Sequence, residues 1–394
     1  MAWHDRLFVD DLPVAGRRVL VRCDFNVPLD AERRVTDDRR IRGAIPTLRS
    51  ILERGGRPVV MTHLGRPKGK PDPAFDLAPV APALESAAGA RVTRLDDCIG
   101  AEVERAVAAA GDGTIVLLEN VRFHPGETAN DPGFCDALAR LGDVYVNDAF
   151  GTAHRAHAST AGIVSHVSLV AAGDLLKSEL DHLRVVREPE RPLMVVLGGA
   201  KVSDKLAVLE ALAPHADVLA IGGAMAYTFM AARGEPTGAS RTEPDRIQDA
   251  RRVMRAAEAS GRRLLLPSDH VVAQRLEAGA PSRVVREIPE GWLGVDIGPE
   301  TASRYAEEIG SARTLFWNGP MGVFEIPAFS EGTRRVALAA ADSGAVTVVG
   351  GGDSLAAVNQ VGVGDRITHL STGGGASLEY VQGLELPGVT ALER

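Results

Sequence analysis

Short runs of aliphatic residues alternate with segments of helical periodicity along nearly the whole chain. In the first half the aliphatic runs, which we interpret as β-strands, cover residues 18–23, 57–62, 114–118 and 143–146. Between the first two runs, apolar residues recur at helical spacing from Ile41 to Leu52, and Gly55 and Gly56 end this helix. Strands that alternate with helices are typical of parallel sheets, so the pattern predicts an α/β fold.

The same pattern begins again in the second half, which predicts a second sheet. Its strands are expected at residues 193–197, 217–221, 263–266, 314–317, 345–349 and 366–370. Between the two sets, residues 173–187 predict a single helix. A chain of 394 residues exceeds the size at which one hydrophobic core keeps growing, so two domains are expected. We predict a first domain at 1–172, a connector helix at 173–188, a second domain at 189–380 and a C-terminal segment at 381–394.

Composition and charge disfavour several classes of protein. The net charge of −8 disfavours a nucleic-acid partner, because such proteins usually carry a basic surface that offsets phosphate charge. No apolar run approaches the ~18 residues that span a bilayer, so no membrane association is expected. Residues 1–11 lack the basic start and the long apolar stretch of a secretory signal, which favours the cytoplasm. Cys23, Cys98 and Cys135 form neither a CxxC pair nor a Cys/His zinc spacing, and we expect reduced, mostly buried thiols.

Polar side chains follow the predicted strands of the first half at the points where the strands end. Asp24 and Asn26 follow the first strand, where they could receive a ligand hydroxyl. Parallel sheets bind ligands at this edge. One arginine can donate two parallel hydrogen bonds to the oxygens of a carboxylate or a phosphate. The pattern therefore predicts a site for a small acid that also carries a phosphate, formed by Arg40, Arg66, Arg122 and Arg155. The alternative is that each arginine is a surface residue with its own salt-bridge partner.

His154 and His157 are close in sequence, so a metal site is conceivable. No third ligand lies nearby in the sequence, and we expect structural hydrogen bonds instead.

Glycine-rich turns follow the strands of the second half, although no P-loop sequence occurs. The strand at 193–197 is followed by Gly198 and Gly199 and then by Lys201 and Lys205, which we expect on one face at the start of a helix. Lysine is rare in this otherwise arginine-rich chain, so two ammonium groups here predict contacts with phosphates. Chance surface lysines are the alternative.

Three further glycine-rich turns end strands of the second half. They lie at 222–223, 350–354 and 371–377, and the last two are expected to open helices, whose free N–H groups attract phosphate. Asp353 lies within one of them, and a single carboxylate beside phosphates is how Mg²⁺ is usually held. Glu325, after the strand at 314–317, could accept hydrogen bonds from a ribose, with helix capping as the alternative.

Together these segments resemble the phosphoglycerate kinase family. Between residues 18 and 380 the matching strings, in the family's order, are RVLVRCDFNVP, THLGRP, ENVRF, NDAFGTAHRAHAST, LGGAKVSDK, DIGPET, FWNGPMGVFE, VVGGGDS and STGGGASLEY. The resemblance implies two Rossmann-like three-layer domains with mostly parallel sheets, joined by a connector helix, in a monomer whose C-terminal segment folds back on the first domain. It implies phosphoryl transfer between ATP or ADP, with Mg²⁺ as cofactor, and 3-phosphoglycerate or 1,3-bisphosphoglycerate, accompanied by domain closure.

The resemblance also assigns roles to residues. The acid would contact Asp24, Asn26, Arg40, His63, Leu64, Gly65, Arg66, Arg122 and Arg155. The nucleotide would contact Lys205, Gly222, Gly223, Glu325, Gly351, Gly352, Asp353 and Ser354, with Asp353 on magnesium. The phosphoryl group in flight would be surrounded by Arg40, Lys201, Gly373, Gly374 and Gly375. The sequence departs from the commonest family pattern at 171–174, at His270 and at 381–384.

Two other functions compete with this interpretation. A nicotinamide dehydrogenase would need a GxGxxG run that opens a helix after a strand, and the chain has none. A non-catalytic nucleotide sensor should lack at least one of Arg40, Lys201, Asp353 or the Gly373 turn, and all are present. A carboxylate acceptor is already ionised at neutral pH, so a kinase of this kind needs no general base.

Overall fold

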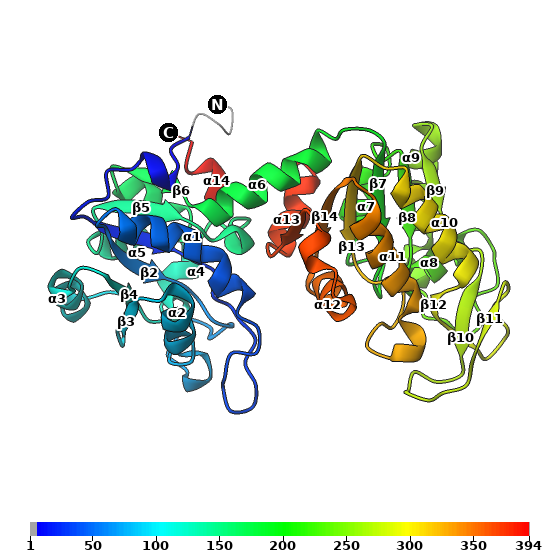
Figure 1. Ribbon diagram of the computed structural model, residues 1–394, viewed down its shortest axis with the longest axis horizontal. Helices are drawn as coiled ribbons and strands as arrows, with labels where there is room; N and C mark the ends of the chain where they lie inside the picture. The colour runs from blue at the N-terminus through cyan, green and yellow to red at the C-terminus, as the bar shows by residue number, and fades with distance from the viewer. Residues whose placement is uncertain (1–5, 394) are drawn as a thin grey trace. The chain divides into compact units, whose positions relative to one another are not determined.

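The structure, a computed structural model, describes residues 6–393 (Figure 1). Residues 1–5, which belong to the segment predicted to lack a secretory signal, and residue 394, the end of the predicted C-terminal segment, lie outside the described residues. The chain divides into two compact units: one holds the residues up to Leu180 and those from Glu385 onward, and the other is Asp181–Leu384. The division falls within helix α6 (Asp174–Arg187). The domain boundaries at 172, 188 and 380 stay a prediction, because contacts alone do not define where independently folding parts begin.

The first unit is built on a six-stranded sheet in the order β3-β4-β2-β1-β5-β6, in which all neighbours are parallel. The strands are β1 (Arg18–Arg22), β2 (Arg57–Met61), β3 (Arg91–Arg94), β4 (Thr114–Leu117), β5 (Val144–Asn147) and β6 (Val170–Ala172). The four predicted strands correspond to β1, β2, β4 and β5. The sequence did not predict the edge strands, because β3 is partly exposed and has no aliphatic run, and β6 is only three residues long.

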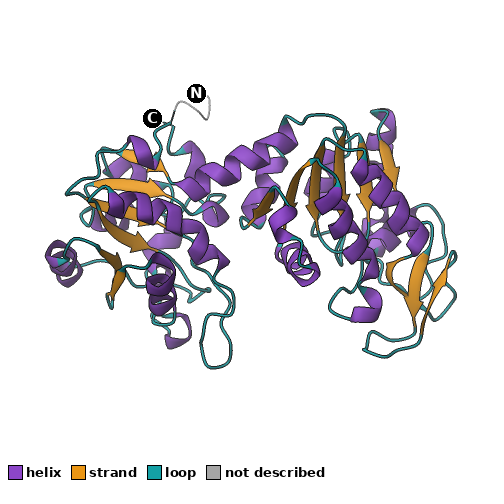
Figure 2. Ribbon diagram, viewed as in Figure 1, coloured by secondary structure: helices purple, strands orange, loops and turns teal. Residues whose placement is uncertain are grey.

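Helices lie on both faces of this sheet (Figure 2). On one face α1 (Arg39–Glu53) and α2 (Val80–Ala88) contribute Ile41, Leu48 and Leu84 to a core with Val19 and Val60 of the strands. The other helices of this unit are α3 (Ala101–Ala109), α4 (Pro125–Ala129), α5 (Pro132–Ala139) and α14 (Pro387–Thr390), and its 3-10 turns are η2 (Val9–Asp11), η3 (Pro73–Phe75), η4 (Val121–Phe123), η5 (Phe150–Thr152) and η6 (Gly162–His166). The helix predicted between the first two strands is α1, so that prediction is confirmed.

The second unit contains a six-stranded parallel sheet in the order β15-β14-β13-β7-β8-β9. Its strands are β7 (Leu193–Leu197), β8 (Val218–Ile221), β9 (Arg263–Leu265), β13 (Thr314–Asn318), β14 (Val346–Gly350) and β15 (His369–Ser371), and they correspond to the six predicted ones. A smaller antiparallel sheet was not predicted; it consists of β10 (His270–Ala273), β11 (Ser282–Val285) and β12 (Leu293–Ile297). Its strands are short and β11 is mostly exposed, so hydrophobic periodicity does not mark them.

The helices of the second unit are α7 (Leu206–Leu212), α8 (Met225–Ala232), α9 (Ile247–Ala259), α10 (Pro299–Gly310), α11 (Glu331–Asp342), α12 (Gly352–Val361) and α13 (Gly375–Val381), with 3-10 turns η7 (Pro244–Arg246), η8 (Pro327–Phe329) and η9 (Gly364–Arg366). Tyr305, Val336 and Val358 of α10, α11 and α12 pack on Val196 and Trp317, so these helices cover one face of the sheet. The predicted α/β fold with two mostly parallel sheets is confirmed. None of the helices in the described part of the chain combines the length and the hydrophobicity that a membrane crossing requires.

Candidate functional site

In the first unit, four loops gather at one edge of the sheet. They follow β1, β2, β4 and β5, which are consecutive neighbours in the order β4-β2-β1-β5 and all parallel. The carboxyl ends of these strands therefore meet, which is where such sheets bind ligands. The loops carry all of the predicted acid-binding residues except Arg40, which lies in the first turn of α1.

Three of the predicted arginines come together in one pocket. Arg66, Arg122 and Arg155 line a pocket of about 370 Å³, together with His157. Arg122 donates from Nη1 to the carbonyl of Gly65 at 2.9 Å, and the Nε of Arg155 is 3.2 Å from a ring nitrogen of its neighbour His154. Within residues 6–393, none of the three arginines forms an ion pair with Asp or Glu. The alternative of three unrelated surface salt bridges is therefore not supported.

Burial, and after it the neighbouring arginines, act against positive charge in this pocket. Burial and the nearby Arg22 and Arg155 lower the pKa of Arg122 to about 10, so it is still charged at neutral pH. Burial, Arg122 and Arg22 lower the pKa of His157 to about 4, so this ring is neutral. A bound anion would relieve the repulsion that both shifts express.

The loops after β1 and β2 are joined by hydrogen bonds. Asn26 accepts from the backbone N–H of Gly65 at 2.8 Å, and Arg40 donates to Asp24 at 2.5 Å. Burial alone would raise the pKa of Asp24, but His63, Arg40 and Arg22 lower it to about 2. Asp24 is thus an ionised acceptor that positions Arg40.

Packing explains why leucine and glycine occupy positions 64 and 65. The Leu64 side chain is buried in the core of the first unit, and its carbonyl accepts from Asn120 at 2.8 Å. Gly65 has φ +60°, and a Cβ there would lie 2.2 Å from the ring of Phe75. Only glycine fits this turn, which brings the loop of Arg66 to the pocket.

A buried network beneath this edge was not predicted. Arg22, the last residue of β1, is fully buried and donates from Nε to the hydroxyl of Ser159 at 2.7 Å. That hydroxyl donates to Glu127 at 2.6 Å, and Arg22 also lies 3.3 Å from a ring nitrogen of His63. An arginine at the end of an otherwise apolar strand was a usable signal, whereas the partner Glu127 had none.

In the second unit, glycine-containing loops after β7, β8, β13 and β14 lie at one edge of the second sheet, whose strands are likewise neighbours. A pocket of about 200 Å³ opens there, and the predicted residues Gly223, Glu325 and Asp353 line it. Tyr227 of α8 and Gly294 and Val295 of β12 also line it and were not predicted. The unpredicted antiparallel sheet thus contributes one wall of this pocket.

Backbone packing explains the paired glycines of these loops. Gly223 has φ +65°, and a Cβ there would lie 2.5 Å from the backbone nitrogen of Gly199. A Cβ on Gly222 would lie 2.3 Å from the sulfur of Met321, so this glycine supports the loop after β13. The loops after β7, β8 and β13 therefore pack backbone against backbone, and the N–H groups of Gly199 and Gly223 donate to the carbonyls of Pro320 and Met321.

The predicted placement of the two lysines on one helix face is wrong. Helix α7 begins only at Leu206, with Lys205 as its N-cap residue, and Lys201 lies in the preceding loop. Glu243 accepts from both the backbone N–H and the hydroxyl of Ser203, at 3.1 and 2.6 Å, and these bonds hold the segment between the lysines as turns. Burial lowers the pKa of Lys205, against the opposing effect of the nearby Asp353 and Asp204.

The two glycine turns predicted to open helices do so. Helix α12 begins at Gly352, with Gly351 as its N-cap residue, and α13 begins at Gly375, after Gly373 and Gly374. Ser354 is buried and accepts from the N–H of Gly319 at 2.6 Å, so it supports the loop after β13 rather than the pocket.

Asp353 and Glu325 are exposed carboxylates at the pocket. Asp353 lies in the first turn of α12, and Glu325 caps no helix in the described residues, because η8 follows Ile326. One exposed carboxylate at a pocket of about 200 Å³, with room for water and phosphate oxygens, fits the coordination that Mg²⁺ prefers.

His154 and His157 belong to no group of three potential metal ligands within the described chain. The Nδ1 of His157 lies 3.7 Å from a carboxylate oxygen of Glu127.

Comparisons with known proteins agree on one family. The family described as phosphoglycerate kinase matches residues 9–384. A phosphoglycerate kinase of Rubrobacter xylanophilus is 56% identical over 391 residues, which is 98% of each chain. One of Chlorobium limicola is 52% identical over 390 residues, again 98% of each chain. The solved structure of phosphoglycerate kinase from Coxiella burnetii has a TM-score of 0.88 and 39% identity, and the match covers 98% of this chain and 99% of that one.

Proposed function

This chain belongs to the phosphoglycerate kinase family and is a phosphotransferase, and from this premise we propose that it catalyses reversible phosphoryl transfer between 1,3-bisphosphoglycerate with MgADP and 3-phosphoglycerate with MgATP. The reaction would serve glycolysis and gluconeogenesis. We also propose that the protein acts as a monomer in the cytoplasm.

The observation that carries this proposal is the pocket of Arg66, Arg122 and Arg155. Three guanidinium groups without an acidic partner in residues 6–393 call for an anionic ligand, and their planar donors suit both a carboxylate and a phosphate. Asp24 and Asn26 lie on the neighbouring loop, where an ionised carboxylate and an amide can accept from a hydroxyl of the ligand. A small phosphorylated hydroxy acid combines these three groups.

The nucleotide would occupy the pocket of the second unit. Gly223, Asp353 and Glu325 line it, and Lys205 lies close enough to Asp353 for its pKa to respond to that carboxylate. Asp353 would hold the magnesium ion of the nucleotide, whose charge offsets that of the phosphates. Lys205 would contact the phosphates, and Glu325 would accept from the ribose.

Transfer requires alignment and neutralisation rather than proton abstraction. The acceptor carboxylate is ionised at neutral pH, and the charge of the moving group spreads over its three equatorial oxygens. Lys201, Arg40 and the N–H groups of the turn at Gly373, Gly374 and Gly375 would stabilise that charge. We propose direct in-line transfer to the carboxylate without a covalent enzyme intermediate.

Closure of the protein during the reaction follows from binding the two substrates on different units. The reacting atoms must approach to roughly 3 Å, and water must be excluded because it would hydrolyse the acyl phosphate. A hinge motion about α6 and the nearby loops would satisfy both needs.

A coupled assay tests the proposed activity. The protein is incubated with 3-phosphoglycerate, MgATP and an acyl-phosphate reductase, with and without EDTA, and oxidation of the reduced nicotinamide is followed. We expect turnover that EDTA abolishes. A preparation with no magnesium-dependent signal would contradict the proposal.

A further inference from the structure

A group of three potential metal ligands lies in the first unit, away from the arginine pocket. Asp97 and Cys98 lie in the loop between β3 and α3, and His124 lies between η4 and α4. One carboxylate oxygen, the sulfur and one ring nitrogen are all within 4.8 Å of one another. It is the one such group within residues 6–393. This group could not be predicted from the sequence, because Cys98 and His124 are brought together by two separate loops.

The three side chains differ in their exposure to solvent. Cys98 is fully buried, so its sulfur is held by the core. The side chain of Asp97 is 52% exposed and that of His124 is 28% exposed, so both can rotate towards an ion. The ring of His124 stacks on Phe134, with 5.3 Å between ring centroids, which sets its plane. Zinc bonds of about 2.0 to 2.3 Å in a tetrahedral site place the ligand atoms roughly 3 to 4 Å from one another, which is within the 4.8 Å span of these three atoms. The ring nitrogen and the carboxylate oxygen, now 2.7 Å apart, would have to separate slightly to admit the ion.

Hydrogen bonds already hold two ligands together. The Nε2 of His124 lies 2.7 Å from an oxygen of Asp97, and the same oxygen accepts from the backbone N–H of Cys98 at 2.6 Å. In this arrangement a proton bridges the ring and the carboxylate. An ion that bridged them would replace that proton and add the sulfur as a third ligand.

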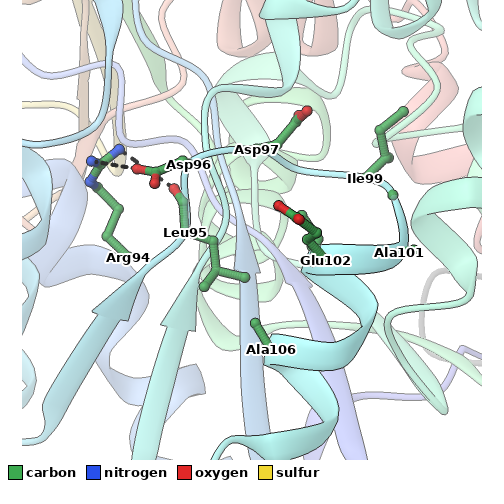
Figure 3. Close-up of a pocket in the computed structure, with 10 residues that line it drawn as sticks. Arg94, Leu95, Asp96, Asp97, Ile99, Ala101, Glu102 and Ala106 are labelled. Carbon is green, nitrogen blue, oxygen red and sulfur yellow. Dashed lines mark hydrogen bonds and ion pairs between the residues drawn. The ribbon is translucent and has the colours of Figure 1, made fainter.

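The surroundings of Asp97 favour a cation. Arg94, the last residue of β3, is paired with Asp96 at 2.9 Å and with Glu119 at 2.6 Å, so its charge is already compensated. Figure 3 shows this pair and, at the same pocket, Asp97 on the loop with Glu102 at the start of α3. This pocket of about 400 Å³ adjoins the group through Asp97 alone, because Cys98 and His124 do not line it. The exposed side chain of Asp97 and the partly exposed ring of His124 leave room for water as a fourth ligand.

From this geometry we propose that Asp97, Cys98 and His124 form a zinc site with one solvent-accessible coordination position. Sulfur with imidazole selects zinc over magnesium or calcium, which prefer oxygen ligands. On binding, bonds form from zinc to the sulfur, to Nε2 of His124 and to an oxygen of Asp97. The thiol proton leaves to solvent, the proton between His124 and Asp97 moves to Nδ1 of the ring or to solvent, and no oxidation or reduction occurs. The ion would cross-link the loop before α3 to the loop before α4.

Cobalt(II) is the probe for this site, because a thiolate ligand gives a sulfur-to-cobalt charge-transfer band that oxygen ligands do not. The full-length protein is freed of metal with a chelator and titrated with cobalt in the absence of nucleotide, and zinc is then added as competitor. We expect the band to saturate at one cobalt per chain and to disappear on addition of zinc. No band, or a band that zinc does not remove, would overturn the proposal.

Cobalt titration of single-residue variants tests which side chains bind the ion. Cys98→Ser should abolish the band, and His124→Gln should weaken cobalt binding roughly tenfold or more. If Cys98→Ser does not fold, His124→Gln decides, because its ring is partly exposed; unchanged cobalt affinity there would refute the site.

The chain offers a matched control. His166 and Asp136 form a similar pair, with a ring nitrogen 2.5 Å from a carboxylate oxygen. Cys135 is adjacent to Asp136 in the sequence, just as Cys98 is adjacent to Asp97. Within the described residues, however, Cys135, Asp136 and His166 do not form a group of potential metal ligands. Cys135→Ser and His166→Gln should leave the cobalt band unchanged. Loss of the band in these controls, to the same degree as in Cys98→Ser, would mean that the effect is not specific and would reject the assignment.

Discussion

At the scale of single residues, the first unit is notable for positive charge that lacks a partner. Most arginines of the chain are paired, as Arg18 is with Asp143 and Arg33 with Asp76. Arg66, Arg122 and Arg155 are different, because they share a pocket and the described residues offer them no acid. Their residue type and their positions after strands were enough to predict from the sequence that these three arginines lie together.

Arg66 allows a clean test of the acid site. Its side chain is exposed and makes no hydrogen bond or ion pair in the described structure, so Arg66→Ala should leave the melting temperature unchanged. Loss of a charge-assisted contact of about 1.5 to 3 kcal/mol should lower kcat/KM for 3-phosphoglycerate by roughly 10- to 100-fold. The KM for ATP should not change. Steady-state kinetics with each substrate varied in turn measure this, and Arg91→Ala, at an exposed position on β3, is the control.

Lys201 tests the transfer step itself. If its ammonium group stabilises the moving phosphoryl group, Lys201→Ala should reduce kcat by roughly 100-fold or more while nucleotide affinity changes little. Arg40→Ala should behave in the same way. Turnover assays and calorimetric titration with ADP measure the two quantities separately, with Lys70→Ala as the control. Equal losses in both quantities would show that these residues serve binding instead.

Contacts between residues far apart in the sequence could not be predicted, even where one partner, such as Arg22 at the end of its strand, carried a signal. Arg22 and Glu127 are fully buried and joined through Ser159, but they lie far apart in the sequence. The same holds for Glu243, whose bonds to Ser203 decide where α7 begins and thereby place Lys201 outside a helix. Helical spacing alone predicted Lys201 and Lys205 on one face of a helix. The prediction failed because the side chain of Glu243, from a distant segment, holds the residues between the two lysines as turns.

At the scale of elements, the strands that the sequence predicted are the central ones. Central parallel strands are buried on both faces and read as aliphatic runs, as β7 and β13 do. The edge strand β3 is only partly buried and the antiparallel strand β11 is largely exposed, so no such run marks them. The strand β12 is mostly buried, but Gly294 and Asp296 interrupt its aliphatic residues, so the part of the nucleotide pocket that it forms was missed as well.

The start of α6 carries a titratable group whose effect on stability can be tested. Asp148, just after β5, accepts from the N–H groups of Leu175 and Leu176 at 2.9 and 3.1 Å. Burial nevertheless raises the pKa of Asp148 to about 7. The folded protein therefore keeps this proton between about pH 4, where the unfolded chain releases it, and about pH 7, so the contribution of Asp148 to stability falls as pH rises through that range.

Asp148→Asn should remove that dependence. The amide oxygen can still accept from the two N–H groups, so the variant should match the parent protein at acidic pH and exceed it in stability at about pH 8. The matched control is Asp143→Asn, because the hydrogen bond from Arg18 holds the pKa of Asp143 below its usual range. Stability from Asp143 is present at neutral pH and lost as pH falls, so this variant should be the less stable one at about pH 8. Urea denaturation at several pH values measures both, and the same sign for the two variants would contradict the assignment.

At the scale of the whole molecule, the chain passes between the two units twice, once through α6 and once near residue 384. The final residues complete the first unit. Gly388 donates its N–H to the carbonyl of Ala153 at 2.8 Å, and its own carbonyl accepts from Asn147 at 2.9 Å. Leu386, Val389 and Leu392 are buried there.

Deletion of residues 385–394 should therefore destabilise the first unit and spare the second. The three apolar side chains are each worth roughly 1.5 to 3 kcal/mol when buried, so the loss should reach several kcal/mol. Hydrogen exchange read by mass spectrometry separates the units: peptides of β1 and β5 should lose protection, whereas peptides of β7 and β13 should not. A mutation of the exposed Leu384, just before the deleted segment, is the control, and uniform loss of protection across both units would contradict this division.

The late position of this segment also bears on how the protein is made. Residues 385–393 are synthesised after the whole of Asp181–Leu384, so the amino-terminal unit, although begun first, can acquire these contacts only after the second unit has been synthesised. The unit Asp181–Leu384 is continuous in sequence and has all of its residues available earlier. The nascent chain would thus complete its two halves in the reverse of the order in which they are translated.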